Sequence, residues 1–462
     1  MTTPRPAGHD GPTSDDLLGL SQIARRLGIG PSVISNWKTR YPTEFPAPRS
    51  GTSGRPLYSF SEVRAWIEQV PGRAALVRAA APGADADDAE VMSTVNRLRE
   101  ELRADVPVRD VPSVVALAAA LVHIGRDRLE VPNDGWEAAG IARLISEASV
   151  SDPWLFDLAA RVSASISRPL DELVARAVRI ISGIDDLAAL LDHVLEPGAV
   201  RRGADAEHRS AAEEALSSMI RSVAPQGFPS ATDLASGLAT VLAEAVGDER
   251  AGKVELHDID DEIVQLAAVR MLLRGIPVDA IAGDSLGGDP PRRHDLVVAE
   301  PVIGVRPSKA AAAADGTSRY PWGAIGLASA DMAWVQTAAL STAPGGVGLV
   351  VTAATALADA ATKDARRALV ADGTLRAVVT VPSPHPRTGA VTDLAIWVVG
   401  ADAATCGLPA DSVLLMHART EDELATVLER FRALWGGTPS IGSDGGSAAV
   451  VSRADLIESG SR

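Results

Sequence analysis

Residues Lys253–Gly275 read KVELHDIDDEIVQLAAVRMLLRG, and this stretch decides the fold. It opens with an apolar-rich run that is typical of a short strand and that ends in the acids Asp258 and Asp260. The residues that follow carry apolar side chains at helical spacing. A strand that leads directly into a helix is typical of the βα units of a mainly parallel sheet.

The same alternation continues on both sides of this stretch, from about Glu207 onward. Further strand-like runs are ATDLA (231–235), VDAIAG (278–283), HDLVVAE (294–300), GVGLVVTA (346–353), LRAVVTV (375–381) and LAIWVVG (394–400). Helical stretches such as ADMAWVQTAALSTA (330–343) separate some of them. We therefore predict a Rossmann-like α/β domain over residues 206–405. A C-terminal extension over residues 406–462 would follow, with the apolar run SVLLMHA (412–418) and one more helix.

The chain before this domain has a different pattern, because its apolar spacing is helical throughout. VMSTVNRLREEL (91–102), VVALAAALVHIG (114–125) and LDELVARAVRII (170–181) show this spacing, and no strand-like alternation interrupts it. We predict a helical domain over residues 89–205. The fold class expected for the whole chain is therefore multidomain, with an N-terminal segment, a helical domain and an α/β domain.

The N-terminal segment has the pattern of a DNA-binding module. Residues 1–14 are rich in Pro, Gly, Ser and Thr and are expected to form a disordered tail. Residues 15–72 contain two short helical runs around the turn Gly30–Ser32, a Gly-rich stretch at 51–58 and a further helix from Ser59. This order resembles the winged helix-turn-helix of MerR-like and excisionase-like proteins. The alternative from the same residues is a small helical domain that binds another protein.

The resemblance implies double-stranded DNA as a partner. Short polar side chains early on the second helix suit the major groove, and basic side chains suit phosphates. The residues expected to contact DNA are Arg25, Ser32, Ser35, Asn36, Lys38, Arg40 and Arg55.

The charge of this segment differs from that of the chain. The whole chain has a net charge of −16, but phosphate binding depends on the charges that touch the DNA backbone. From Ser21 to Phe60 there are six basic residues and one acid, Glu44, and six minus one gives a local charge of +5. A local basic face therefore favours DNA.

Composition excludes several classes of protein. The single cysteine, Cys406, rules out a disulfide framework and a Cys-based zinc site, and we expect no bound metal. We find neither a charged-then-apolar leader nor an apolar run of membrane-spanning length, so we expect a cytoplasmic protein that does not bind membranes.

Polar side chains follow the predicted strands of the α/β domain in a regular order. Asp233 and Gly237 follow the first strand, Asp258 the second and Asp284 the third, and Glu300-Pro301 follows the fourth. An acid about 20 residues after the first βα turn commonly holds ribose hydroxyls. Each acid alone would equally serve as a cap of a turn or helix.

Taken together, residues 207–418 are similar to the N6-adenine DNA methyltransferases, of the type found as modification subunits of type I restriction systems. Further matching segments are Tyr320–Gly323, Ala330–Val335, Pro344–Gly346 and Thr392–Val398. The resemblance implies S-adenosylmethionine (SAM) as the cofactor. It also implies that Asp233, Gly237, Asp258 and Asp284 bind this cofactor, and that Glu300 and Pro301 occupy the catalytic motif.

This sequence departs from the family pattern where the chemistry takes place. The family's first motif is Asp-Pro-x-x-Gly-x-Gly, and its second glycine is Ala239 here, whose Cβ is expected to hinder the approach of the cofactor. The family's catalytic motif is Asn/Asp-Pro-Pro-Phe/Tyr, which reads Glu300-Pro301-Val302-Ile303 here. In the family, the acceptor binds the adenine amino group and the aromatic ring stacks on the flipped base.

Three hypotheses follow from these residues. The first is a DNA-binding protein with a regulatory or structural role, whose methyltransferase-like domain is catalytically degenerate, a pseudoenzyme that has either kept or lost SAM binding. The second is an active SAM-dependent N6-adenine DNA methyltransferase. The third is a subunit that needs a partner, as in restriction-modification systems, or that forms a homodimer. The sequence alone leaves open whether the protein is an enzyme.

Overall fold

The computed structural model describes most of the chain after residue 85 and parts of the chain before it. The described residues are 17–18, 20, 23, 34, 38, 41, 44–52, 55–68, 86–128, 138–195, 210–224, 227–246, 251–288, 292–315, 317–384, 391–400, 406–437 and 448–459. The chain divides into two compact units, residues 1–90 and residues 91–462, and each is described by itself.

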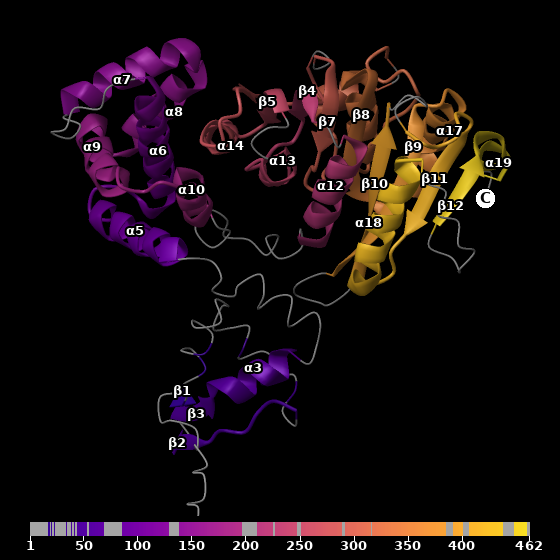
Figure 1. Cartoon of the computed structure of the whole chain (residues 1–462). Helices are drawn as coiled ribbons and strands as arrows, with labels where there is room; N and C mark the ends of the chain where they lie inside the picture. Colours follow the sequence, from indigo (N-terminus) through magenta and orange to yellow (C-terminus); the bar gives the residue numbers. More distant parts are fainter. Residues whose placement is uncertain are drawn as a thin grey trace, which may run out of the picture. The chain divides into compact units, whose positions relative to one another are not determined.

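The larger unit contains a nine-stranded sheet with the order β12-β11-β9-β10-β8-β7-β4-β5-β6 (Figure 1). The strands are β4 (Phe228–Asp233), β5 (Ala251–Asp258), β6 (Val278–Ala282), β7 (His294–Ala299), β8 (Thr342–Ala353), β9 (Leu375–Pro384), β10 (Val391–Val399), β11 (Ser412–His417) and β12 (Ala448–Ser452). In this order, the adjacent strands β8, β7, β4, β5 and β6 pair in parallel, and so do β9 and β11. The pairs β8–β10, β10–β9 and β11–β12 are antiparallel. The prediction of a mainly parallel sheet with βα units is confirmed.

The C-terminal residues are part of this sheet. β11 pairs in parallel with β9, and β12 pairs antiparallel with β11. Strands β11 and β12, which lie within the predicted C-terminal extension (residues 406–462), therefore belong to the same sheet. The apolar run at 412–418 explains this, because such a run is buried most fully beside another strand.

Helices cover both faces of the sheet. On one face lie α12 (Ser210–Val223), α13 (Thr240–Val246), α14 (Asp261–Leu272) and α18 (Glu421–Trp435). On the other face lie α16 (Asp331–Ser341), α17 (Lys363–Ala371) and α19 (Arg453–Ser459). Alternate residues of the central strands enter the two cores, so that Val298 packs on the first face and Val297 on the second. This is the α/β/α layering of a Rossmann-like domain.

A helical bundle precedes the sheet in the same unit. It contains α5 (Ala86–Leu102), α6 (Val111–Arg128), α7 (Ala138–Ser151), α8 (Pro153–Ser165), α9 (Leu170–Ile181) and α10 (Leu187–Leu195). By length and composition Val108–Arg126 is apolar enough to cross a membrane, contrary to the expectation from the sequence. However, 83% of its apolar window is buried inside the protein, so α6 is the core helix of the bundle.

The smaller unit is a three-stranded sheet with helical residues packed on it. β2 (Ser50–Thr52) and β3 (Arg55–Ser59) form an antiparallel pair, and β1 (Leu17–Leu18) pairs with the other edge of β3. The helix α3 (Phe60–Glu68) follows β3 directly. Ile23 and Ile34 are helical and fully buried in the core of this unit. The β2–β3 pair lies where the sequence predicts a wing. The helix-turn-helix itself stays a prediction, because most of its residues lie outside the described ones.

Asp192 of α10 connects the helical bundle to the sheet domain. Its two carboxylate oxygens accept hydrogen bonds from Arg270 Nε at 2.7 Å and from Arg274 Nη2 at 2.5 Å. Arg270 of α14 also donates to the carbonyl of Leu238 at 3.0 Å, in the loop that follows β4. The bundle is thereby tied, through one arginine, to the loop after the first strand of the domain.

We predict that Asp192→Ala destabilises the protein by about 2 kcal/mol, because two largely buried guanidinium groups lose a charged acceptor. Equilibrium unfolding in urea measures the effect. Arg143→Ala is the matched control, since its ion pair with Glu147 is exposed, and we expect a loss of less than about 0.5 kcal/mol there. Equal losses in the two variants would contradict a linking role for Asp192.

Candidate functional site

The strand order places the candidate site at one edge of the sheet. β4 pairs in parallel with β5 on one side and with β7 on the other. The chain thus leaves β4 in one direction and later returns to its opposite side. In open α/β sheets, ligands bind in the crevice outside the carboxyl ends of the strands where the order reverses in this way.

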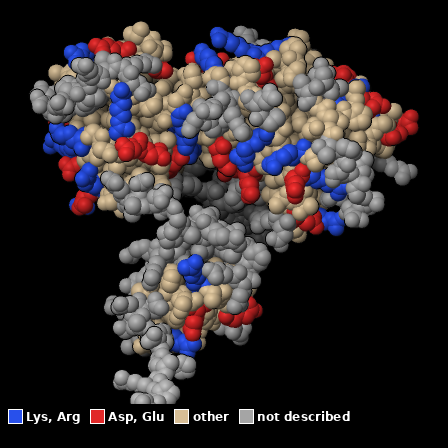
Figure 2. All heavy atoms as spheres, viewed as in Figure 1, with Lys and Arg blue, Asp and Glu red and all other residues tan. Residues whose placement is uncertain are grey.

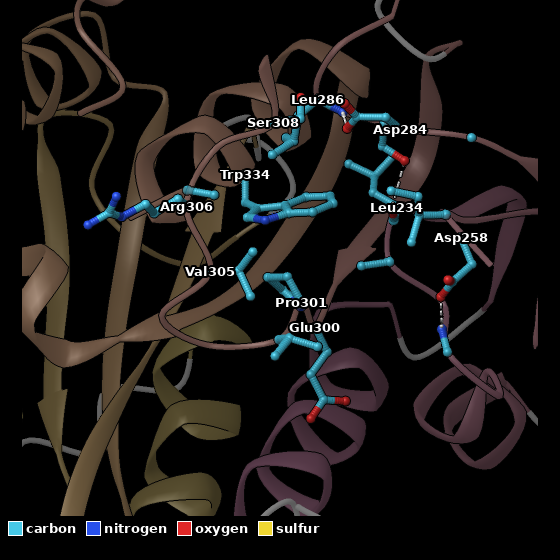
Figure 3. A pocket seen from close by; sticks show the side chains of 17 residues that line it. Leu234, Asp258, Asp284, Leu286, Glu300, Pro301, Val305, Arg306, Ser308 and Trp334 are labelled. Carbon is cyan, nitrogen blue, oxygen red and sulfur yellow. Dashed lines mark hydrogen bonds between the residues drawn. The ribbon is translucent and has the colours of Figure 1, made fainter. Parts of the chain in front are cut away.

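A cavity of about 440 Å³ opens at this position (Figure 3). It is lined by residues at or after the carboxyl ends of four parallel strands, by Ala330, which precedes α16, and by Trp334 in its first turns. The lining residues are Leu234, Ala235, Gly237, Asp258, Ile259, Gly283, Asp284, Ser285, Leu286, Glu300, Pro301, Val302, Val305, Arg306, Ser308, Ala330 and Trp334. Small-molecule sites commonly have volumes of roughly 300–1,000 Å³. The structure therefore brings Gly237, Asp258, Asp284, Glu300 and Pro301 together at one ligand-sized cavity.

Asp233 differs from the other predicted site residues, because it is buried and is not among the residues that line the cavity. Its Oδ1 accepts a hydrogen bond from the backbone N–H of Ala235 at 3.2 Å. Burial raises the pKa of the Asp233 carboxyl to about 7, and the negative charge of Asp258 adds to this, while the Ala235 N–H opposes it. Asp233 therefore stabilises the turn after β4 without lining the cavity.

The loop after β4 keeps a backbone that glycine favours. Gly237 has φ 49° and Ala239 has φ 52°, so Ala239 is in the left-handed region that residues with a Cβ rarely adopt. Ala239 is fully buried in the main core and does not line the cavity. Its methyl group therefore points to the core, and the hindrance to a cofactor that the sequence suggests at this position is not seen.

Two carboxylates lie at the opposite side of the cavity from the β7 loop. Asp258 accepts hydrogen bonds from the backbone N–H groups of Gly237 and Asp260, both at 2.9 Å. Asp284 accepts one from the N–H of Leu286 at 3.0 Å. Each carboxylate oxygen has two lone pairs, so both groups keep capacity for a ligand hydroxyl or amino group.

The loop after β7 carries the altered motif. Pro301 is buried and lines the cavity, and Glu300 is half-buried beside it. In Figure 3 the carboxylate of Glu300 extends away from the Trp334 ring. Ile303, at the position of the family's aromatic residue, packs against the main core instead of lining the cavity.

The sequence did not single out Trp334 as a site residue. Trp334 stands in the first turns of α16, and its half-buried indole lines the cavity near Val305 and Pro301 (Figure 3). The sequence places it only inside a segment that resembles the family. A signal for it was the position of its helix, because α16 precedes β8, the strand beside β7, and so begins near the same edge of the sheet.

The predicted DNA-contact residues are only partly visible. Arg25, Ser32, Ser35, Asn36 and Arg40 lie outside the described residues, and Arg55 lies in β3. Lys38 is helical and exposed, with its ammonium 5.6 Å from the centre of the buried Tyr58 ring.

One of the six counted basic residues is paired with an acid. Arg49 forms an ion pair with Glu62 of α3, an acid just beyond the counted segment. In the larger unit, Figure 2 shows basic and acidic side chains interspersed over the visible face. Among the described residues no group of three or more metal-binding side chains is present.

We predict that Asp233 makes stability fall as pH rises. Its folded pKa of about 7 exceeds the ordinary value of 3.8, so the folded protein binds this proton more tightly than the unfolded chain. The contribution of this proton to the free energy of unfolding is complete below about pH 4, and it is lost progressively as the pH rises to about pH 7. In Asp233→Asn this contribution disappears. Urea unfolding at several pH values should therefore show the variant gaining stability relative to the native protein between about pH 4 and pH 7. A constant difference would contradict the raised pKa.

The comparisons with known proteins agree with this geometry. Residues 213–433 match the family model described as N-6 DNA Methylase. A type I restriction-modification methyltransferase subunit from Streptococcus thermophilus has a similar structure, with a TM-score of 0.54, 13% identity, and coverage of 80% of this chain and 96% of that one. A putative class I S-adenosylmethionine-dependent methyltransferase from Listeria monocytogenes gives a TM-score of 0.50, 13% identity, and coverage of 75% and 98%.

A third structure describes complex assembly and conformational transition of a type I restriction-modification system. It gives a TM-score of 0.54 and 14% identity, and it covers 80% of this chain and 89% of that one. No curated protein matches the sequence. The solved structures at these identities establish the fold, and the family model matches its α/β part. Residues 213–433 are therefore similar to the N-6 DNA methylase family.

Proposed function

We propose that the protein binds duplex DNA and that its methylase-type domain keeps the ligand cavity without supporting methylation of adenine N6. The observation that carries this proposal is a contrast within one cavity. The side formed by the loops after β4, β5 and β6 has Gly237, Asp258 and Asp284 in place, whereas the loop after β7 has Glu300 and Ile303 at the positions that handle the base.

The cofactor side fits a SAM-type ligand. Asp258 and Asp284 face the cavity with lone pairs available for ribose hydroxyls and an amino group. The turn at Gly237 lets the backbone approach a ligand, since Ala239 directs its methyl group into the core. When bound, SAM would supply a methyl group on a positively charged sulfur. We propose that SAM or its product S-adenosylhomocysteine (SAH) binds here.

The substrate side does not fit methyl transfer to adenine. Glutamate is one methylene longer than aspartate, which displaces the acceptor oxygen by about 1 Å, and such a shift costs about 100-fold in rate. The side chain of Ile303 contributes to the core, so the position that supplies an aromatic ring in the family offers none to the cavity. Both changes alter side chains that would contact the reacting base, and neither alters the residues on the cofactor side.

DNA binding is proposed for the N-terminal unit. The support is the β2–β3 pair at the expected wing, the exposed Lys38 and the local excess of basic residues in the sequence. A DNA partner also favours a cytoplasmic location. One solved neighbour is described as part of an assembled type I restriction-modification system, so a partner subunit is a further proposal.

An active N6-adenine methyltransferase is the second candidate. Pro301 is buried in the cavity wall at the family's position, and Trp334 offers another aromatic surface in the same cavity. Binding and transfer experiments separate the two candidates.

We predict that SAH binds to the purified full-length chain, as measured by calorimetry. Asp258→Asn should weaken binding by about tenfold, the loss expected when a charged hydrogen bond to a ligand becomes neutral. Asp279→Asn is the control, because Asp279 pairs with Lys253 on the exposed edge of the sheet. Unchanged affinity in Asp258→Asn, or no binding by the native chain, would remove the cofactor from the proposal.

Restoring the motif tests the catalytic part. We predict that the double variant Glu300→Asn, Ile303→Phe gains at least about 100-fold in methyl transfer from labelled SAM to mixed-sequence duplex DNA, because the acceptor returns to its position. The native chain should stay at background. Rapid transfer by the native chain would instead support the second candidate.

Lys38→Ala should weaken binding to duplex DNA and lower the slope of log affinity against log salt by about one, as expected for one phosphate contact. Fluorescence anisotropy over a salt series measures this slope. Arg49→Ala should have a smaller effect, since Arg49 is paired with Glu62. Identical slopes for the native chain and Lys38→Ala would rule out a phosphate contact at Lys38.

A further inference from the structure

We propose that a second cavity of the larger unit binds a small monocarboxylate with an apolar chain. The chain of the ligand would lie on the sheet, and its carboxylate would lie among Lys363, Arg366 and Arg367. This cavity shares no lining residue with the cavity at the ends of β4 to β7. The proposal therefore goes beyond the proposed function and does not depend on it.

The second cavity lies between the sheet and the helices that cover its second face. Strands β9, β10 and β11 supply its floor, and its walls come from α17, α19 and the residues that lead from β8 to α17 (Figure 1). Its volume is about 440 Å³, and small-molecule sites commonly have volumes of roughly 300–1,000 Å³. The second cavity is therefore large enough for a small ligand.

The floor of this cavity is apolar. Val378, Trp397 and Val413 are buried there, and Leu415 is half-buried beside them. The indole N–H of Trp397 is already used, because it donates to Thr352 Oγ1 at 2.8 Å. A ligand with polar groups along its body would lose their hydrogen bonds to water on this floor and gain none in return. An apolar chain carries no such cost.

The short helix α19 leaves apolar side chains for a ligand to cover. None of its seven residues is buried, and Leu456 and Ile457 face the cavity while only half-buried. Partly uncovered apolar side chains around a concave site indicate a surface that a ligand covers. An apolar chain between α19 and the floor would complete the burial of both.

One face of α17 gives the cavity a positive rim. Lys363, Arg366, Arg367 and Val370 have the spacing of a single helix face, and all four line the cavity. Lys363 and Arg367 form no ion pair within the described part of the chain. They are like charges four residues apart in the first turns of a helix, where positive charge is unfavourable. A bound anion would relieve both repulsions.

Arg366 is held in place beside these two cations. Its Nη1 donates to the carbonyls of Ala356 at 3.1 Å and Asp359 at 2.6 Å, and to Thr362 Oγ1 at 2.7 Å. Burial lowers the pKa of this guanidinium, and the negative charge of Asp359 opposes the effect only in part. Among the described residues it has no ion-pair partner. A partly buried cation is costly without a counter-ion, so its place at the cavity favours an anionic ligand.

The hydrogen-bonding groups of the lining decide the class of the anion. The three cations offer donors, and no side chain that lines the cavity carries a carboxylate, amide or hydroxyl oxygen. The ligand should therefore have acceptors at one end and no donors elsewhere, as an apolar carboxylate has. A carboxylate also matches the fork of an arginine side chain. A peptide segment fits less well, because its backbone N–H groups would find no side-chain acceptor.

Calorimetry on the full-length chain tests the site, with decanoate as the probe. We expect one saturable site per chain, and an affinity that falls about fourfold for each methylene removed from decanoate to hexanoate. Octanol should bind at least about tenfold more weakly than octanoate, because it lacks the charge. Arg367→Gln should weaken decanoate by about tenfold. Arg419→Gln is the matched control, since Arg419 is exposed and does not line the cavity.

Acetylation of lysines locates the bound probe. Decanoate should protect Lys363 and leave Lys309 reactive, because Lys309 is exposed next to Ser308 of the first cavity. Leu456→Trp should fill the second cavity and abolish binding, with circular dichroism as the check of folding. If SAH does not bind the native chain, the proposed cofactor fails while these measurements still decide the second site. Protection of Lys309 instead, equal affinities of the native chain and Arg367→Gln, or no saturable binding would each overturn the proposal.

Discussion

The site depends on one constraint of the sheet, the parallel pairing of β4 with β5 on one side and with β7 on the other. Parallel strands must all end at the same edge, so the loops after β4, β5, β6 and β7 meet there whatever their own sequences are. The reversal of strand order at β4 keeps those loops apart enough to leave a cavity. This arrangement places Asp258 and Asp284 on one side of the cavity and the loop after β7 on the other.

Two hydrogen-bonded links hold the loop after β4 in its shape. The Gly237 N–H donates to Asp258, which joins the first loop to the second, and Arg270 donates to the Leu238 carbonyl while it pairs with Asp192 of the helical bundle. The left-handed backbone of Ala239 costs about 1–2 kcal/mol relative to an ordinary conformation. These links and the full burial of Ala239 offset that cost. These contacts fix the turn that Gly237 presents to the cavity.

The strands and the acids could be predicted from the sequence for the same physical reason. Each strand of the parallel core is an apolar-rich run between helical stretches, and a polar residue directly after such a run lies at the carboxyl edge. Asp258 and Asp284 are recognised in this way and do line the cavity. β12 was not predicted, because its five residues follow a Gly- and Ser-rich stretch and gain their place only by pairing with β11.

The sequence did not predict the direction in which particular side chains point. Ile303 turns to the core, Ala239 does the same, and Asp233 supports the loop from behind the cavity. Trp334 reaches the cavity because α16 packs against β7 and β8, and only the position of its helix before β8 points to this contact in the sequence.

The central claim is that this domain binds its ligands but does not transfer a methyl group to adenine. The most direct measurement is a map of N6-methyladenine in the genomic DNA of cells that express the native chain and of otherwise identical cells that lack it. The account predicts that no sequence motif changes its methylation between the two. A motif that is methylated only when the chain is present would contradict it.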